Sequence, residues 1–273
     1  MLLREVEYAR PKSVAEAVTL LSGHENARPL AGGQSLINVM KVRVASPDVV
    51  VDIGRIADLR SIRSAADGSL ELGAGVTYAE LIASDEVRAA RPILADVAIR
   101  IADVQVRNRG TIGGNVCSND PTNHFPPVLA AIGASMTIRS LEAERTVTAE
   151  EFFEGVFMTA VTPGELLTSV TVPALEPGRG DGFASVTIGK DGTGIVNVAA
   201  SVAEGNARIA IGCVAAVPVV VTAAADEVAV RDAVESAGLD PPSDVHASAD
   251  YRRHVAGVCA VRALRAALEG ARA

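Results

Sequence analysis

Two Gly-Gly pairs, Gly32-Gly33 and Gly113-Gly114, constrain this chain more than any other feature of its sequence. Hydroxyl and amide side chains flank them, in the runs Ala31 to Ser35 and Thr111 to Asn115. Glycine permits φ > 0 and a close approach of the backbone, so several backbone N–H groups can point at one anion such as a pyrophosphate. Each pair alone is more often a tight turn than a ligand site. Neither run has the spacing of the Rossmann or Walker motifs.

The composition describes a folded chain with an aliphatic core. Of the 273 residues, 49% are hydrophobic, which excludes a disordered chain, whereas only 3% are aromatic and none is Trp. The length suffices for one large domain or for two to three small ones. The net charge of -8 and the lack of a Lys/Arg cluster argue against a nucleic-acid-binding protein.

The sequence also bears on targeting. Charged residues interrupt the N-terminus at once, so no signal peptide is expected. The most apolar stretch, Cys213 to Ala225, is too short to span a bilayer and contains Pro218. We therefore expect a soluble, cytoplasmic protein with no membrane span.

No metal site or catalytic group stands out. The three cysteines are far apart and none forms a C-x-x-C pair, whereas an iron–sulfur cluster needs about four organised thiolates. The four histidines have no metal-ligand spacing. No Ser/His/Asp or Cys/His arrangement is evident, so we predict no catalytic residue and no metal ligand.

Hydrophobic periodicity and turn residues predict an α+β chain. Ser13 with Glu16, and Thr77 with Glu80, have the capping-box spacing of a helix N-terminus. We expect a loop at the second Gly-Gly pair, and a turn at Glu204-Gly205-Asn206 between the last two strands. The predicted helices cover 13–22, 77–84, 92–103, 127–133, 225–237 and 249–269, and the predicted strands cover 28–30, 48–53, 69–74, 135–139, 166–172, 183–188, 195–203 and 207–214. The Pro- and Gly-rich segment 173–182 is the best domain boundary.

The two Gly-Gly runs, taken together with their flanking residues, point to a particular protein family more specifically than either run alone. The run Gln105 to Asn115, followed by Asn119-Asp120-Pro121, closely resembles the signature of the FAD-binding medium subunits of molybdenum hydroxylases. That family includes the medium chain of aerobic carbon monoxide dehydrogenase and the flavin domain of xanthine dehydrogenase. The segments 31–36, 50–56, 151–155 and 165–170 resemble the same family. The resemblance covers nearly the whole chain and is weakest after Val214.

The resemblance implies an FAD-binding fold of the p-cresol methylhydroxylase (vanillyl-alcohol oxidase) type. Residues 1–55 and 56–175 would form two FAD-binding subdomains that hold FAD between them. Residues 176–273 would form a C-terminal domain of antiparallel sheet and helices, of the carbon monoxide dehydrogenase flavoprotein type. The cofactor-binding residues that it implies are Leu30, Ala31, Gly32, Gly33, Gln34, Ser35, Leu36, Ile101, Thr111, Ile112, Gly113, Gly114, Asn115, His124, Leu167 and Lys190.

Several of these positions carry alternatives. Ile101 and Leu167 could equally be core residues. His124 stands where relatives often have Asp, and could either hydrogen-bond the cofactor or simply pack. A residue near Ile195 replaces an aromatic side chain that covers the flavin in some relatives. The cations Lys41, Arg43, Arg107 and Arg109 could attract an anion, but solvated surface side chains are the commoner interpretation.

The family also implies a function. The chain would be the FAD-dependent oxidoreductase subunit of a heteromeric molybdenum hydroxylase. A small partner chain with [2Fe–2S] clusters would pass it electrons from a large molybdopterin chain, and a quinone, NAD⁺ or O₂ would accept them. The alternatives are a stand-alone flavin-dependent dehydrogenase or oxidase, and a scaffold that has lost FAD. The substrate cannot be read from the sequence.

Overall fold

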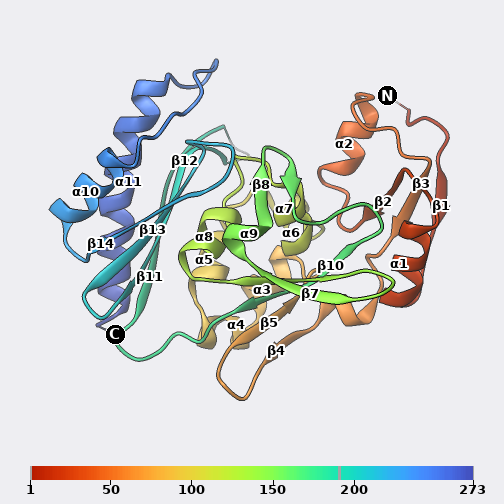
Figure 1. Cartoon of the computed structure of the whole chain (residues 1–273), viewed down its shortest axis with the longest axis horizontal. Helices are drawn as coiled ribbons and strands as arrows, with labels where there is room; N and C mark the ends of the chain where they lie inside the picture. The colour runs from red at the N-terminus through yellow and green to blue at the C-terminus, as the bar shows by residue number, and fades with distance from the viewer. Residues whose placement is uncertain (1, 190–191, 273) are drawn as a thin grey trace.

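The computed structural model describes residues 2–189 and 192–272. Three β-sheets of three or more strands, each with its own helices, follow one another along the chain, and the N-terminal and C-terminal sheets lie on opposite sides of the middle one (Figure 1). Strands and helices alternate in the N-terminal part, whereas the two larger sheets are antiparallel, and the predicted α+β class is confirmed.

The N-terminal sheet is small and parallel. Its strands have the order β1 (Glu7–Ala9), β3 (Val49–Asp52) and β2 (Ala27–Leu30), and its helices are α1 (Val14–Ser22), α2 (Leu36–Lys41) and the 3₁₀-helix η1 (Ala57–Arg60). The side chain of Ser13 accepts a hydrogen bond from the Glu16 N–H, which confirms the predicted start of α1. Parallel strands end at the same edge, so Leu30 and Asp52 are paired there. The segment that follows Leu30 contains the first Gly-Gly pair.

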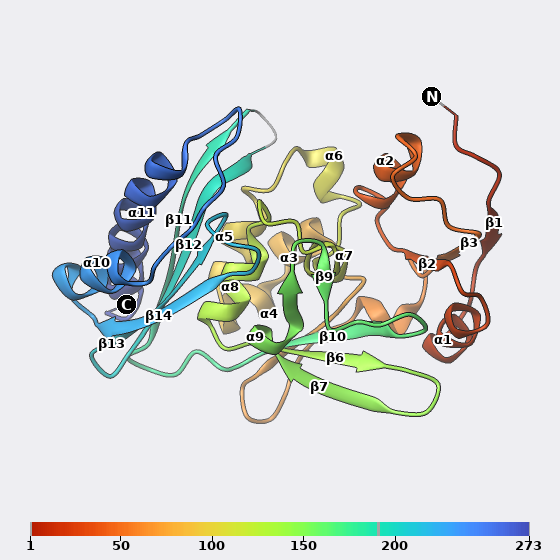
Figure 2. The same ribbon diagram turned by 45° about the horizontal axis from the view of Figure 1, so that its top comes forward.

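The middle sheet is antiparallel and carries most of the helices. Its strand order is β4 (Ile62–Ser64), β5 (Leu70–Gly73), β10 (Leu166–Val172), β6 (Ser135–Arg139) and β7 (Glu144–Thr148). The helices, in chain order, are α3 (Tyr78–Ala83), α4 (Asp85–Ala90), α5 (Ile93–Ala98), α6 (Val104–Arg107), α7 (Ile112–Ser118), α8 (Phe125–Ala131) and α9 (Ala149–Phe152). A two-stranded hairpin, β8 (Phe153–Gly155) and β9 (Met158–Thr159), follows α9. The largest hydrophobic core lies between this sheet and the helices that cover one of its faces (Figure 2).

Two predictions within this part were wrong. The expected helix over 92–103 ends at Ala98, because Ala102 adopts a left-handed backbone (φ 44°) and the Asp103 carboxylate then caps a new helix by accepting from the Val106 N–H. The second Gly-Gly pair is not a loop. It forms the first turn of α7, because the Thr111 side chain accepts from the Gly114 N–H as an N-cap.

The C-terminal sheet is a four-stranded meander backed by a long helix. Its elements are β11 (Gly180–Ile188), β12 (Thr193–Ala203), β13 (Asn206–Gly212), β14 (Val219–Ala224), α10 (Glu227–Ser236) and α11 (Ala249–Gly270). Strand β12 is buried on both faces: Val198 and Ala200 pack into the core beneath α11, whereas Ala199 packs into the core of the middle part. The C-terminal sheet therefore contacts the middle helices α5 and α8 directly.

The turn between β12 and β13 agrees with the prediction, since Glu204 and Gly205 both have φ > 0. Strands β7 and β14 were not predicted. Strand β7 is a polar edge strand with little hydrophobic signal, and β14 follows Pro218 in an apolar stretch without alternation. Among the helices of the described residues, none is long and apolar enough to cross a membrane.

Candidate functional site

The first Gly-Gly segment, residues 31–35, connects the end of β2 to the start of α2. Within the described residues, no carbonyl or side chain accepts a hydrogen bond from any of its five backbone N–H groups. Gly33 has φ 74°, a conformation that favours glycine. Its neighbour Gln34 turns its side-chain amide back onto the Gly32 carbonyl at 3.1 Å. The segment thus presents a run of unused donors, as an anion-binding loop requires.

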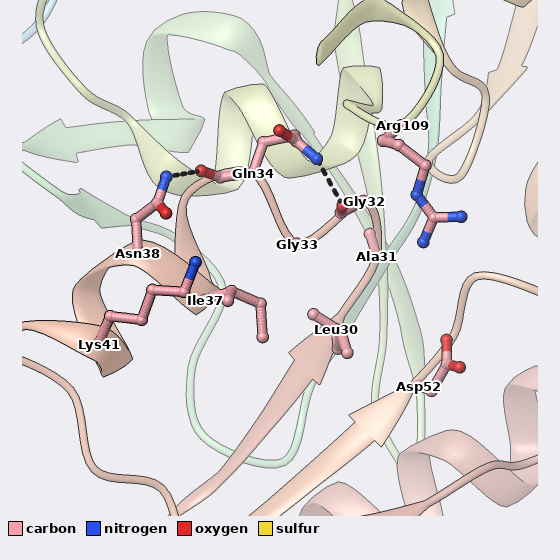
Figure 3. Close-up of a pocket in the computed structure, with 10 residues that line it drawn as sticks. All are labelled: Leu30, Ala31, Gly32, Gly33, Gln34, Ile37, Asn38, Lys41, Asp52 and Arg109. Carbon is pink, nitrogen blue, oxygen red and sulfur yellow. Dashed lines mark hydrogen bonds between the residues drawn. The ribbon is translucent and has the colours of Figure 1, made fainter. Parts of the chain in front are cut away.

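A pocket of about 310 Å³ opens beside this segment (Figure 3). It is lined by Leu30, Ala31, Gly32, Gly33, Gln34, Ile37, Asn38, Lys41, Asp52 and Arg109. The first five of these residues were predicted to bind the cofactor. The other five were not, although Arg109 lies two residues before the second Gly-Gly run and Lys41 lies one helical turn beyond Ile37.

The second Gly-Gly segment, residues 111–115, uses its backbone donors inside the protein. The Ile112 N–H donates to the Val76 carbonyl and the Gly113 N–H to the Ala74 carbonyl, both at 2.9 Å. The Gly114 N–H donates to Thr111 Oγ1 at 3.0 Å. None of these three donors remains for a ligand, which corrects the expectation that both Gly-Gly segments present their amides.

Gly113 is needed for packing. A Cβ atom there would lie 2.5 Å from the Ala74 carbonyl oxygen and 2.9 Å from the Ala74 Cα. Any side chain would therefore push α7 away from the end of β5. Gly114, by contrast, is exposed, and a Cβ there would approach only Thr111 Oγ1, at 2.9 Å.

The two segments touch each other. A Cβ on Gly32 would lie 1.9 Å from the Arg109 carbonyl oxygen and 3.0 Å from the Gly110 Cα. The first segment is thus in direct backbone contact with the residues that lead into the second. Segments about eighty residues apart in the sequence therefore lie side by side.

Asn115 contributes a buried polar atom to this site. Its Nδ2 donates to the Tyr78 hydroxyl at 2.9 Å, but its Oδ1 has no partner among the described residues. A buried acceptor without a donor is costly unless a ligand or water supplies one. The Asn115 carbonyl accepts from Asn123 Nδ2, and Asn197 of β12 donates to the Asn123 carbonyl. A chain of amides therefore connects α7 to the C-terminal sheet.

His124 lies directly before α8 and is buried. Its ring stacks on Phe183 with centroids 5.5 Å apart, and its Nε2 has no partner among the described residues. Burial lowers the pKa of His124 to about 4, so the ring is neutral at neutral pH. The packing alternative is thus realised through Phe183, whereas a hydrogen bond from the cofactor to Nε2 stays a prediction.

The remaining predicted positions differ in their surroundings. Leu167 is buried in β10, and Ile101 is half-buried against the same core, so both pack in the core, and their contact with the cofactor stays a prediction. Ser35 is exposed and Leu36 is half-buried at the start of α2, and neither is among the residues that line the pocket. Ile195 is buried in the C-terminal core. Lys190 lies outside the described residues.

The residues present fit a dinucleotide cofactor. The unused amides of residues 31–35 suit a diphosphate, and the contact at Gly32 leaves no room for a side chain. The orphaned Asn115 Oδ1 suits a donor of the ligand, and the Thr111 hydroxyl, which accepts from Gly114, still has its own proton to donate.

Comparison with known proteins agrees with this geometry. Residues 4–175 match the family described as the FAD binding domain in molybdopterin dehydrogenase. The chain is 38% identical to the carbon monoxide dehydrogenase medium chain of Afipia carboxidovorans, over 100% of this chain and 99% of that one. It is 35% identical to the glyceraldehyde dehydrogenase medium chain of Sulfolobus acidocaldarius, over 96% and 98% of the two chains.

A solved structure of the Cu,Mo-CO dehydrogenase contains a chain that superimposes on this one with a TM-score of 0.93. The two chains are 36% identical, and the match covers 98% of this chain and 99% of the other. The expected FAD-binding fold, the expected family and FAD as the cofactor are therefore confirmed. This chain belongs to the family of FAD-binding domains of molybdopterin dehydrogenases and is an FAD-dependent oxidoreductase.

Proposed function

We propose that this chain is the FAD-carrying electron-transfer subunit of a heteromeric molybdenum hydroxylase. One observation carries the proposal: the chain matches medium chains of dehydrogenases over almost the whole length of both chains. Its partners would be a small chain with [2Fe–2S] clusters and a large molybdopterin chain. The proposal includes the cytoplasmic location expected from the sequence.

The small number of cysteines supports the proposal that the iron–sulfur clusters belong to another chain. This chain has three cysteines, and within the described residues no group of His, Cys, Asp and Glu is arranged to hold a metal ion. A chain with so few thiolates would depend on a partner for iron–sulfur clusters. Substrate oxidation would then take place on the large partner chain.

The residues of this chain would bind and orient the cofactor. The amides of residues 31–35 would hold the diphosphate, and Asn115 Oδ1 with the Thr111 hydroxyl would hydrogen-bond polar groups of the cofactor. The neutral ring of His124, stacked on Phe183, would shape the neighbouring wall without adding a charge. When bound, FAD would supply the redox chemistry between the clusters of the partner and an external acceptor such as a quinone, NAD⁺ or O₂.

The test is the composition and chemistry of the purified complex. The chain is tagged and expressed together with the chains encoded beside it, and the purified material is assayed for flavin, iron and molybdenum. We expect all three, in a complex of three kinds of chain. A chain that purifies as a flavin-containing monomer and is reduced by a small molecule without any partner would instead be a stand-alone flavoenzyme. A colourless chain that takes up no FAD would contradict both.

A further inference from the structure

We propose that Lys41 and Arg109 form a cationic clamp that binds the diphosphate of the cofactor on the first Gly-Gly segment. The inference rests on the proposed function insofar as FAD is the ligand. It assigns a role to two side chains that the sequence alone suggested to be ordinary surface cations.

The clamp is defined by the pocket beside residues 31–35. Lys41 projects from α2 on one side of this segment, and Arg109 precedes α7 on the other (Figure 3). Both line the pocket. Among residues 2–189 and 192–272, neither forms an ion pair, whereas the buried Arg91 and Arg252 both pair with carboxylates. The two cations are therefore available to an anionic ligand.

The single carboxylate of the pocket is already engaged. One oxygen of Asp52 accepts from the Tyr8 hydroxyl, and the other accepts from the Gly54 N–H at 2.9 Å. Asp52 makes no ion pair with either cation among the described residues. The pocket thus keeps an excess of one positive charge, in a chain whose net charge is -8.

The backbone of Arg109 packs directly against the first Gly-Gly segment. Its carbonyl contacts Gly32 so closely that a Cβ atom would lie 1.9 Å away, and this fixes where its side chain starts. Lys41 is fixed in turn because α2 begins directly after the loop. A diphosphate seated on the loop amides would lie between two cations that come from the two parts of the chain carrying the Gly-Gly pairs.

The charge of the diphosphate explains why the backbone amides of residues 31–35 alone would not neutralise it. A diphosphate carries two negative charges, and backbone dipoles offer only partial positive charge. A hydrogen bond to a charged group is stronger than one to a neutral group, and the difference corresponds to roughly tenfold in affinity. Because both cations are exposed, their contribution should weaken as salt screens it.

The experiment measures cofactor affinity in the full-length chain after removal of its flavin. FAD and, separately, ADP are titrated into the wild type, Lys41→Gln, Arg109→Gln and the conservative Arg109→Lys, at low and high salt. Arg139→Gln is the matched control, because Arg139 is exposed and lies on β6 away from the pocket. Thermal unfolding without ligand establishes that all variants are folded.

We expect about a tenfold loss of FAD affinity for each Gln variant and a weaker dependence on salt, with Arg109→Lys and Arg139→Gln close to the wild type. ADP should lose affinity by at least the same factor, since it also presents a diphosphate, and its terminal phosphate carries an additional negative charge. A loss of less than threefold for FAD in both Gln variants would overturn the clamp. A wild type that binds no FAD would instead refute the proposed function, so the two failures are distinguishable.

Discussion

Gly32-Gly33 and Gly113-Gly114 are the same dipeptide in two different surroundings. The first lies in a loop whose backbone donors are unused within the described residues, and its neighbours line a pocket. The second is the first turn of a buried helix, with its donors bonded to Ala74, Val76 and Thr111. One pair therefore keeps its amides unused within the described residues, and we propose that they bind a ligand, whereas the other serves the fold by letting α7 pack against β5. The shared dipeptide does not imply a shared role.

The largest expected effect concerns the packing role. Gly113→Ala places a Cβ atom 2.5 Å from a backbone carbonyl oxygen that cannot move freely, so the flavin-free chain should lose about 3 kcal/mol of unfolding free energy. Gly257→Ala is the control, because a Cβ at this position of α11 meets no atom within 4 Å and Ala favours the helix; it should change stability by less than about 1 kcal/mol. Urea unfolding measures both. Equal losses would mean that the contact with Ala74 is not what selects glycine.

The next largest effect is a pH dependence of stability, which tests whether water is excluded from the buried ring of His124, close to the second Gly-Gly segment in the sequence. The pKa of His124 is about 4 in the folded chain, against 6.5 for an unperturbed histidine. The unfolded chain therefore takes up a proton more readily, so this stability is present above pH 6.5 and is lost as the pH falls toward 4. By pH 5 the loss should be about 2 kcal/mol.

Unfolding free energies at pH 7 and pH 5 check this expectation. His124→Gln should remove that part of the pH dependence, whereas His246→Gln, at an exposed position, should keep it. If the wild type and His124→Gln lose the same unfolding free energy between the two pH values, water reaches the His124 ring. The surroundings of the second segment would then not be shielded from water.

Amide hydrogen exchange compares the two segments directly. Binding of FAD should slow the exchange of residues 31–35 by about tenfold or more, because their N–H groups gain acceptors. Residues 112–114 are already bonded, so their exchange should change far less. Mass spectrometry of peptides from the flavin-free and FAD-bound chain provides the measurement. A larger slowing at 112–114 would reverse the assigned roles.

The smallest effect concerns the conformation of the first segment. Gly33 has φ 74°, so Gly33→Ala should cost about 1 kcal/mol of unfolding free energy in the flavin-free chain. Gly33→Asn should cost less, because Asn adopts this conformation more readily. Thermal and urea unfolding of the two variants separate the cases. If Asn were as unfavourable as Ala, the close contact with Ile37 would be the cause rather than the backbone angle.

Local signals accounted for much of the fold. The caps at Ser13 and Thr77, the apolar periodicity of α1 and α11, and the turn before Asn206 are all found as predicted, because each depends on residues close in the sequence. The helix over 92–103 was predicted too long, since no local signal announces the left-handed Ala102. The polar edge strand β7 lacks the apolar alternation on which strand prediction depends.

The sequence by itself determined the family, the cofactor and the positions of both Gly-Gly pairs, because these depend on residue identity and spacing. The tertiary structure alone decided which pair keeps its amides unused, since that depends on acceptors such as Ala74 and Val76 that lie far away in the sequence. It also decided that Lys41 and Arg109 face one pocket. Both cations look like surface residues until the contact between Gly32 and the Arg109 backbone brings the two parts of the chain together.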